Sequence, residues 1–326
     1  MNVNQFKFKT EGYEPFLDFL KGCCILFVIG SHCLPAQQYI LYPIWGQMAV
    51  PLFLLIQSFH VFKKEDVSLD KKSFVKLVNR ILLPFFLVTS VAFLLKMIQE
   101  GGFTYNLLKQ TIVSGGIGPG SYYPWLYLQF FLLLPIVFLF INKFSMNLLL
   151  SGIIFILISE LLELLCWYIN INDAYYRLLC ICYIFLIYLG LVWAKIGVKI
   201  NKMIVTLSII SLIFIFIFAY TDIKLEPFFF DNDWKIFHWI SYFYPAFLLV
   251  WGLNWLYTRL SKRMKDAFVL LGKYSWEIFL MQMFVLSFLP LEKFLLLGNK
   301  YLMLVLFVFI SFVLSIYPVI LYKKYV

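Results

Sequence analysis

Long apolar runs alternate with short polar stretches along nearly the whole 326-residue chain. A helix that crosses the hydrocarbon core of a membrane needs about 20 mostly apolar residues. Ten runs qualify, at residues 20–37, 43–62, 77–98, 122–141, 147–169, 177–197, 203–220, 236–256, 269–289 and 301–322. This pattern predicts an all-α polytopic membrane protein with about ten transmembrane helices. We interpret residues 1–326 as a single membrane-embedded domain, in which a cytoplasmic segment, 1–19, precedes a transmembrane bundle over 20–322.

The composition supports the same class of protein. Hydrophobic residues make up 63% of the chain, charged residues make up 13%, and the mean hydropathy is +0.89. A soluble globular domain is about 45–50% apolar and about 25% charged. The net charge of +10 is therefore not interpreted as a nucleic-acid signal. We expect membrane lipid as a partner and no nucleic acid. For the orientation of the spans, what matters is which loops carry the positive charge.

Basic residues gather in alternate loops and at the end of the chain. They are Lys63, Lys64, Lys71, Lys72, Lys76, Arg80, Lys143, Lys195, Lys199, Lys202, Arg259, Lys262, Arg263, Lys265, Lys323 and Lys324. The other loops carry far less basic charge, and one is net acidic around Asp222, Glu226, Asp231 and Asp233. By the positive-inside rule, both termini and every basic loop are predicted to be cytoplasmic. The first span is typical of an uncleaved anchor, which indicates a multi-pass protein of the cytoplasmic (inner) membrane.

The six cysteines all lie in apolar runs, at Cys23, Cys24, Cys33, Cys166, Cys180 and Cys182. None belongs to a Cys-x-x-Cys pair or to a Cys/His cluster with zinc spacing. We interpret them as small buried hydrophobic residues, and expect neither a metal site nor a disulfide framework.

The first span begins with charge and places a histidine deep in its apolar part. Lys21 and His32 are eleven residues apart, so on a helix they share one face and lie about 16 Å apart along its axis. Asp18 precedes Lys21 by one turn and can pair with it. Because an ionisable side chain within a membrane is costly, it usually faces protein or water and is functional. We interpret His32 as a general base and Lys21 as a partner for an anion from the cytosol. The structural alternative is a histidine bonded to a neighbouring helix.

A basic segment, 71–80, leads into the third predicted span. Arg80 lies four residues before Pro84, which is expected to bend the helix or to loosen its hydrogen bonding. A planar guanidinium suits phosphate, and we assign Arg80 and Lys76 to anion binding. Ordinary positive-inside topology explains Lys71 and Lys72.

The loop 114–125 is predicted to face outward and has four glycines within six positions. It resembles a phosphate-cradling loop, but the Gly-Lys-Ser/Thr ending is missing. The loop is also predicted to lie on the side of the membrane opposite the cytosolic nucleotides. Tyr122, Tyr123 and Trp125 follow the glycines and would suit a sugar surface. The alternative is an aromatic belt at the membrane interface.

Two carboxylates, Glu160 and Glu163, lie one turn apart on one face of the fifth span. We expect them to pair with His32 or Arg177, or to line a polar cavity. His60 and His238 lie near the ends of spans, where histidine is unremarkable, and we interpret both as structural.

Several of these segments resemble one known family in the same order along the chain. Asp18-x-x-Lys21-Gly22 with the following His32 is similar to the amino-terminal signature of acyltransferase family 3, the ten-helix membrane proteins that O-acylate cell-envelope glycans. Further resemblances are Val50-Pro51-Leu52-Phe53, Arg80 to Pro84, Ser121 to Trp125, and Leu271-Gly272-Lys273-Tyr274-Ser275-Trp276. The chain departs from the family at Lys21, where arginine is common, at Gln57-Ser58 in place of Ser-Gly, and at Gln282 in place of a frequent histidine.

The resemblance implies an O-acetyltransferase-like enzyme without a metal cofactor. Acyl-CoA, most often acetyl-CoA, would enter from the cytosol with its phosphates near Lys21, Lys76 and Arg80. Its pantetheine arm is comparable in length to the separation of Lys21 from His32, so the thioester could reach His32. His32, supported by Asp18 and Lys21, would then deprotonate the acceptor. That acceptor would be a hydroxyl of a cell-surface or lipid-linked glycan. The residues assigned to bind it are Tyr122, Tyr123, Trp125, Glu160 and Glu163. Direct transfer and an acyl-enzyme relay both remain open.

Two other classes of protein explain part of the pattern. A proton-coupled transporter or flippase for a glycan or small anion would use intramembrane glutamates and histidine as a proton relay. Against it, the sequence has no inverted repeat and no matched pair of broken spans. A scaffold in an envelope-assembly complex would tolerate substitution of His32 and Glu160. The cost of burying these two ionisable residues in a membrane argues against such tolerance.

Overall fold

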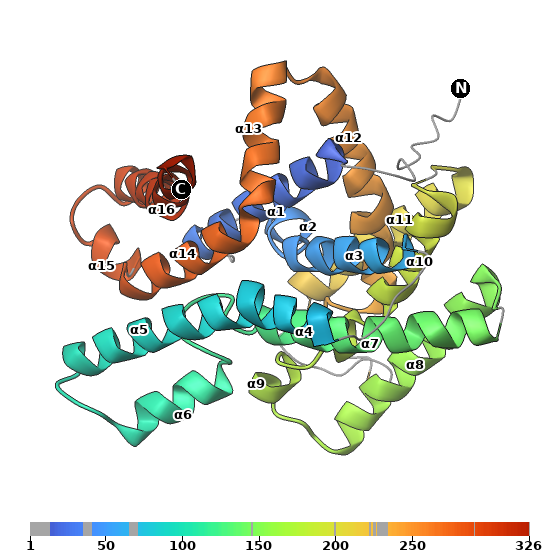
Figure 1. Cartoon of the computed structure of the whole chain (residues 1–326), viewed down its shortest axis with the longest axis horizontal. Helices are drawn as coiled ribbons and strands as arrows, with labels where there is room; N and C mark the ends of the chain where they lie inside the picture. The colour runs from blue at the N-terminus through green and yellow to red at the C-terminus, as the bar shows by residue number, and fades with distance from the viewer. Residues whose placement is uncertain are drawn as a thin grey trace. The chain divides into compact units, whose positions relative to one another are not determined.

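The computed structural model describes residues 14–34, 41–64, 71–144, 146–198, 200–221, 223, 226, 234–289 and 291–325. Within these ranges the regular elements are all helices, without a β-strand (Figure 1). In chain order they are α1 (Pro15–Cys33), α2 (Tyr42–Trp45), α3 (Ala49–Phe62), α4 (Lys71–Leu77), η2 (Val78–Leu82), α5 (Leu83–Gln99), α6 (Tyr105–Val113), α7 (Tyr123–Lys143), α8 (Leu148–Tyr168), α9 (Asp173–Tyr176), η3 (Ile181–Tyr183), α10 (Phe185–Ile196), α11 (Lys202–Tyr220), η4 (Trp239–Tyr242), η5 (Tyr244–Leu249), α12 (Val250–Arg259), α13 (Lys262–Lys273), α14 (Ser275–Phe288), α15 (Leu291–Leu295) and α16 (Lys300–Tyr325).

Part of the predicted topology falls outside the described residues. Most of the segment 1–19 lies there, as do Lys199, Asp222, Asp231 and Asp233 and the side chains of Lys323 and Lys324. The cytoplasmic placement of both termini stays a prediction.

Among the described residues, seven helices are long and apolar enough to cross a membrane. They are Pro15–Cys33, Tyr42–Phe62, Lys71–Gln99, Tyr123–Lys143, Leu148–Tyr168, Lys202–Tyr220 and Lys300–Tyr322. Helices α13 and α14 meet the same criteria only as a pair bent by 71°, which would make an eighth span. The chain is a multi-pass integral membrane protein, and the number of about ten spans stays a prediction.

The remaining two predicted spans are short or irregular. The apolar helix Ile181–Ile196 is shorter than the others, and the predicted span 236–256 is divided among the 3₁₀-helix η4, the π-helix η5 and α12. Pro245 lies in the first turn of η5 and has no backbone N–H to donate, so one helical hydrogen bond is missing between η4 and η5.

The chain packs as two compact units assembled from alternating segments. The first unit contains residues 1–17, 50–69 and 126–265, and the second contains residues 18–49, 70–125 and 266–326.

In the first unit, side chains satisfy the carbonyl groups that the irregular helices leave free. Helix α11 packs against η4 and η5, and α10 packs against α8. The donors are Trp193 Nε1 to the Ala246 carbonyl (3.1 Å), Ser208 Oγ to the Phe243 carbonyl (3.1 Å) and Ser211 Oγ to the Ser241 carbonyl (2.6 Å). A broken helix within a membrane needs such internal partners because lipid supplies none.

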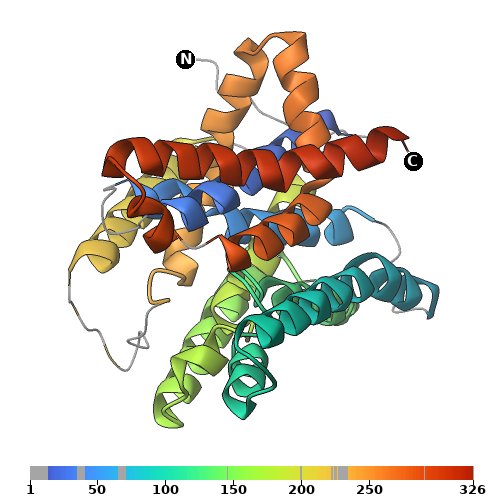
Figure 2. The same ribbon diagram turned by 90° about the vertical axis from the view of Figure 1, so that its left-hand side faces the viewer.

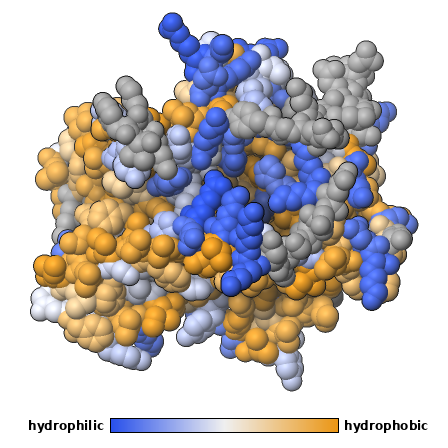
Figure 3. All heavy atoms as spheres, in the orientation of Figure 1, coloured by the Kyte–Doolittle hydropathy of each residue, from blue (hydrophilic) through white to orange (hydrophobic). Residues whose placement is uncertain are grey.

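In the second unit, α14 packs against α16 and α5, and α6 folds back beside α5 (Figures 1 and 2). Helix α5 exposes a stripe of large apolar residues at helical spacing: Leu83, Leu87, Leu94 and Ile98. In Figure 3, hydrophobic side chains cover α5, whereas hydrophilic ones gather over α4. An exposed apolar stripe on a long helix is the face expected to contact lipid.

Candidate active site

The amino-terminal half of α1 fixes the position of Lys21. The helix begins at Pro15, a residue whose fixed φ suits the first helical position, so it starts five residues before the predicted span at 20–37. Lys21 forms an ion pair with Asp18 across one helical turn. Asp18 is buried, and the Lys21 side chain keeps 26% of its surface exposed. The ammonium group is thus held by a carboxylate and still accessible.

Two glycines allow α1 to cross α13 at backbone contact. A Cβ on Gly272 would overlap the backbone carbonyl of Asp18, and a Cβ on Gly22 would overlap that of Phe268. Phe19 and Phe268 pack beside the crossing, with ring centroids 5.1 Å apart. Small residues permit such close helix crossings in membranes. The Lys21-Gly22 and Leu271-Gly272-Lys273 motifs therefore belong to one packing contact, which holds the turn that carries Lys21.

His32 occupies the last turn of α1, and its side chain is exposed. Ile29 and Cys33 beside it are fully buried, whereas the His32 side chain is exposed. Among the described residues, no group forms a hydrogen bond or an ion pair with its imidazole. The exposed imidazole is therefore not committed to another group of the described chain.

The glycine-rich loop lies against His32, which the sequence did not predict. A Cβ on Gly120 would lie 3.6 Å from His32 Nε2 and 2.9 Å from the ring of Phe279 in α14. Gly120 has φ +86° and Gly118 has φ +101°, a left-handed backbone that glycine adopts without strain. A Cβ on Gly118 would overlap the Met283 carbonyl of α14. The end of α1, the loop and α14 converge here within the second unit.

The loop is held in shape by its own side chains and by the rings that follow it. Ser121 Oγ donates to the Ser114 carbonyl (2.9 Å), and Trp125 Nε1 donates to the Gly115 carbonyl (2.7 Å). Tyr123 is buried and meets Phe279 edge to face at 5.6 Å, whereas Tyr122 is half-buried. Tyr123 and Trp125 thus stabilise the loop, and Tyr122 and Trp125 are both more exposed than the buried Tyr123.

The basic segment lies on α4 and the π-helix η2. Lys76 and Arg80 are both exposed. Leu83 N–H donates to the Val78 carbonyl, five residues back, and Pro84 has no N–H with which to restore the α-helical pattern. The expected loosening of the backbone before Pro84 is present as this π-helix.

The chain matches a family model described as an acyltransferase domain, of the acyltransferase 3 type, over residues 14–323. It belongs to this family. No curated protein and no solved structure gives a significant match. The protein is therefore a membrane acyltransferase, and the motifs from Asp18 to Trp276 belong to one family domain.

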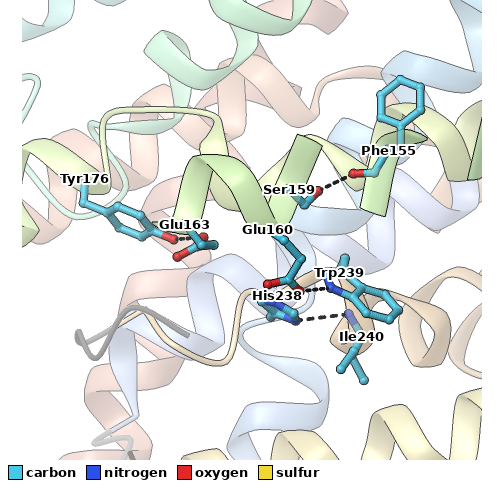
Figure 4. Close-up of polar contacts among 8 residues, drawn as sticks. All are labelled: Phe155, Ser159, Glu160, Glu163, Tyr176, His238, Trp239 and Ile240. Atoms are coloured by element: carbon cyan, nitrogen blue, oxygen red, sulfur yellow. Dashed lines mark hydrogen bonds and ion pairs between the residues drawn. The ribbon is translucent and has the colours of Figure 1, made fainter. Parts of the chain in front are cut away.

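The two intramembrane glutamates of this acyltransferase have partners other than the expected His32 or Arg177. Both lie in the first unit (Figure 4). Glu163 is buried and accepts a hydrogen bond from Tyr176 Oη (2.5 Å). Burial, reinforced by the neighbouring Cys182 and Glu163, raises the pKa of Tyr176 well above its ordinary value. Tyr176 consequently remains the donor in this bond.

Glu160 belongs to a histidine–carboxylate pair that the sequence analysis missed. Its Oε1 lies 3.2 Å from His238 Nε2 and accepts a hydrogen bond from Trp239 Nε1 at 2.5 Å. His238 is buried, and its ring stacks on Phe214 with centroids 5.8 Å apart. His238 is close to Glu160 only because the fold brings residues 78 apart in sequence together, and no local pattern signals that contact.

No group of three potential metal ligands occurs in the part of the chain that the structure describes. The six cysteines are buried and free. The second unit thus offers an accessible imidazole beside a glycine loop, together with an accessible ammonium group on the same helix.

Proposed function

We propose that this acyltransferase moves an acyl group, in the first instance acetyl, from cytosolic acyl-CoA to a hydroxyl of a cell-surface or lipid-linked glycan at the cytoplasmic (inner) membrane. His32 is the general base. The observation that carries the proposal is the open, unbonded imidazole of His32 within a family domain for acyl transfer. An imidazole without an internal partner is free to accept a proton from an alcohol and to return it later.

The proposed donor site begins at Lys21. Its accessible ammonium group attracts phosphate, and its ion pair with Asp18 fixes its direction. Lys76 and Arg80 supply further positive charge on an exposed surface, with the guanidinium able to hold phosphate through two hydrogen bonds. The eleven residues from Lys21 to His32 span about 16 Å of helix, a length comparable to the pantetheine arm. The thioester can then reach His32 while the phosphates stay at the cytosolic end.

The acceptor contacts proposed in the second unit are aromatic rings. Tyr122, Tyr123 and Trp125 lie beside the loop that contacts His32, and Tyr122 and Trp125 are half-buried, whereas Tyr123 is buried. In the first unit, Glu160 and Glu163 are the candidate contacts for acceptor hydroxyls. The Oε2 atom of Glu160 is buried and has no hydrogen-bond partner among the described residues, so it retains capacity to accept one.

The alternative function is a proton-coupled transporter or flippase for a glycan or small anion. The Glu160–His238 pair favours it, since carboxylate–histidine pairs serve as proton relays in membranes. Proteoliposomes loaded with glycan, but lacking any acyl donor, separate the two functions. An acyltransferase leaves the glycan inside until an acyl donor is supplied and then labels it. Glycan efflux driven by a pH gradient, without acylation, would establish the transporter.

A further inference from the structure

The backbone of the glycine loop has hydrogen-bond donors that the protein itself does not use. Gly115 N–H donates to the Ile112 carbonyl and Gly116 N–H donates to the Thr111 carbonyl. The N–H groups of Gly118 and Gly120 have no acceptor among the described residues. Both glycines are half-buried, so these two N–H groups are left to water or to a bound ligand as their acceptor.

The Gly120 donor lies near the proposed base, and Gly118 is two residues before it in the same loop. A Cβ on Gly120 would be 3.6 Å from His32 Nε2. Because a Cβ lies about 2.5 Å from its own amide nitrogen, the Gly120 nitrogen is within about 6 Å of His32 Nε2. That separation accommodates an attacking hydroxyl at the imidazole and a carbonyl oxygen at the amide. We propose that the backbone amides of Gly118 and Gly120 form an oxyanion hole for the acyl carbonyl, an inference that rests on the proposed acyl transfer at His32.

The loop is rigid enough to serve this purpose. Gly118 is pressed against α14, where a Cβ would overlap both the Met283 carbonyl and Ser287 Oγ. Ser121 and Trp125 bind the two sides of the loop together through the Ser114 and Gly115 carbonyls. Donors that are fixed before the reaction stabilise developing negative charge without reorganising, which is the basis of oxyanion-hole catalysis.

The chemistry of the step is balanced. His32 takes the proton of the acceptor hydroxyl as its oxygen bonds to the thioester carbon, and the carbonyl oxygen becomes an oxyanion held by the N–H groups of Gly118 and Gly120. Collapse of this intermediate breaks the carbon–sulfur bond. The departing CoA thiolate then receives the proton from the His32 imidazolium, and the products are the acyl ester and free CoA.

A carbonyl fits this loop better than a phosphate does. Lys21, the proposed phosphate partner, lies about 16 Å away along α1, and the loop lacks the Gly-Lys-Ser/Thr ending of a phosphate-cradling loop. What lies beside the loop is the imidazole of His32, the group proposed to deprotonate the acceptor hydroxyl that attacks the thioester carbon.

Replacing an amide by an ester tests the inference without adding a side chain. Glycolate introduced in place of Gly120, or of Gly118, removes one N–H and leaves the carbon skeleton unchanged. The matched control is glycolate in place of Gly116, whose N–H donates to the Thr111 carbonyl within the same loop. We expect kcat to fall about 10²–10³-fold at Gly120 or Gly118, with little change in the KM for acyl-CoA, and the Gly116 control to stay within a few fold of wild type.

Equal activity in all three ester variants, or an equal loss in all three, would overturn the oxyanion hole while leaving the acyltransferase proposal intact. Wild-type protein that transfers no acyl group would overturn both.

Infrared spectroscopy supplies a test that needs no variant, using an acyl-CoA ketone analogue with a ¹³C-labelled carbonyl. We expect the bound carbonyl stretch to fall below its value in water, and an unshifted or raised frequency would contradict the inference.

Discussion

Gly272 touches the backbone carbonyl of Asp18 so closely that even a methyl side chain would overlap it. Asp18 in turn holds Lys21, the proposed anchor for the donor phosphates. A glycine more than 250 positions away in sequence therefore determines where a charge at the start of the chain lies.

We predict that Gly272→Ala destabilises the protein by about 1–3 kcal/mol, because overpacking forces the two helices apart. Thermal unfolding in detergent measures this effect. Gly252→Ala is the matched control, since Gly252 lies within α12 with no atom near its Cβ position, and alanine is about 1 kcal/mol better than glycine in a helix. Equal unfolding temperatures for the two variants would contradict the close crossing.

Arg80→Gln is predicted to raise the KM for acyl-CoA about tenfold, which corresponds to about 1.4 kcal/mol of lost phosphate binding. The kcat value should change little, because Arg80 is assigned to the donor's phosphates and not to the reacting carbon. Lys71→Gln, in the same basic segment and equally exposed, serves as the control. If both variants raise KM equally, the effect is one of general surface charge.

Tyr176→Phe is predicted to destabilise the first unit by about 1–3 kcal/mol at neutral pH, because it leaves the buried Glu163 without its hydroxyl donor. The pH dependence follows from the raised pKa of Tyr176. A group whose folded-state pKa is raised contributes stability below its unfolded pKa, here about 10, and loses that contribution as pH rises further.

The difference in unfolding temperature between wild type and Tyr176→Phe should therefore shrink as the pH rises above about 10. Thermal unfolding of both proteins at pH 8 and at pH 10.5 checks this. A difference that grows with pH would mean that Tyr176 does not donate to Glu163 in the folded protein.

His238→Phe is predicted to lower stability by about 1–3 kcal/mol, since Glu160 then loses one of the two groups that contact its Oε1 atom. Acyl transfer by the folded protein should stay within a few fold of wild type, because the proposed base is His32. Activity per folded molecule, measured after size-exclusion chromatography, separates the two effects. A loss of activity as large as that of a His32 variant would transfer the role of base to His238.

The length of the apolar runs predicted most of the long helices, since span length depends on the thickness of the membrane. The Asp18–Lys21 pair was also predictable, because its spacing is local. The contacts of Gly120 with His32 and of Glu160 with His238 were not, because they depend on how distant helices pack. The span predicted at 236–256 stays a prediction, and its division into a 3₁₀-helix, a π-helix and an α-helix was not foreseen, although Pro245 within it lacks a backbone N–H.

The most direct test of the account is acyl transfer by purified protein in liposomes, with radiolabelled acetyl-CoA on one side and a mixed glycan acceptor on the other. His32→Ala is compared with wild type and with His60→Ala, a histidine near the end of α3 that the proposed reaction does not use. The account predicts labelled glycan from wild type and His60→Ala, and a loss of at least about 10²-fold in His32→Ala, the size expected when a general base is removed. Near-normal labelling by folded His32→Ala would contradict it.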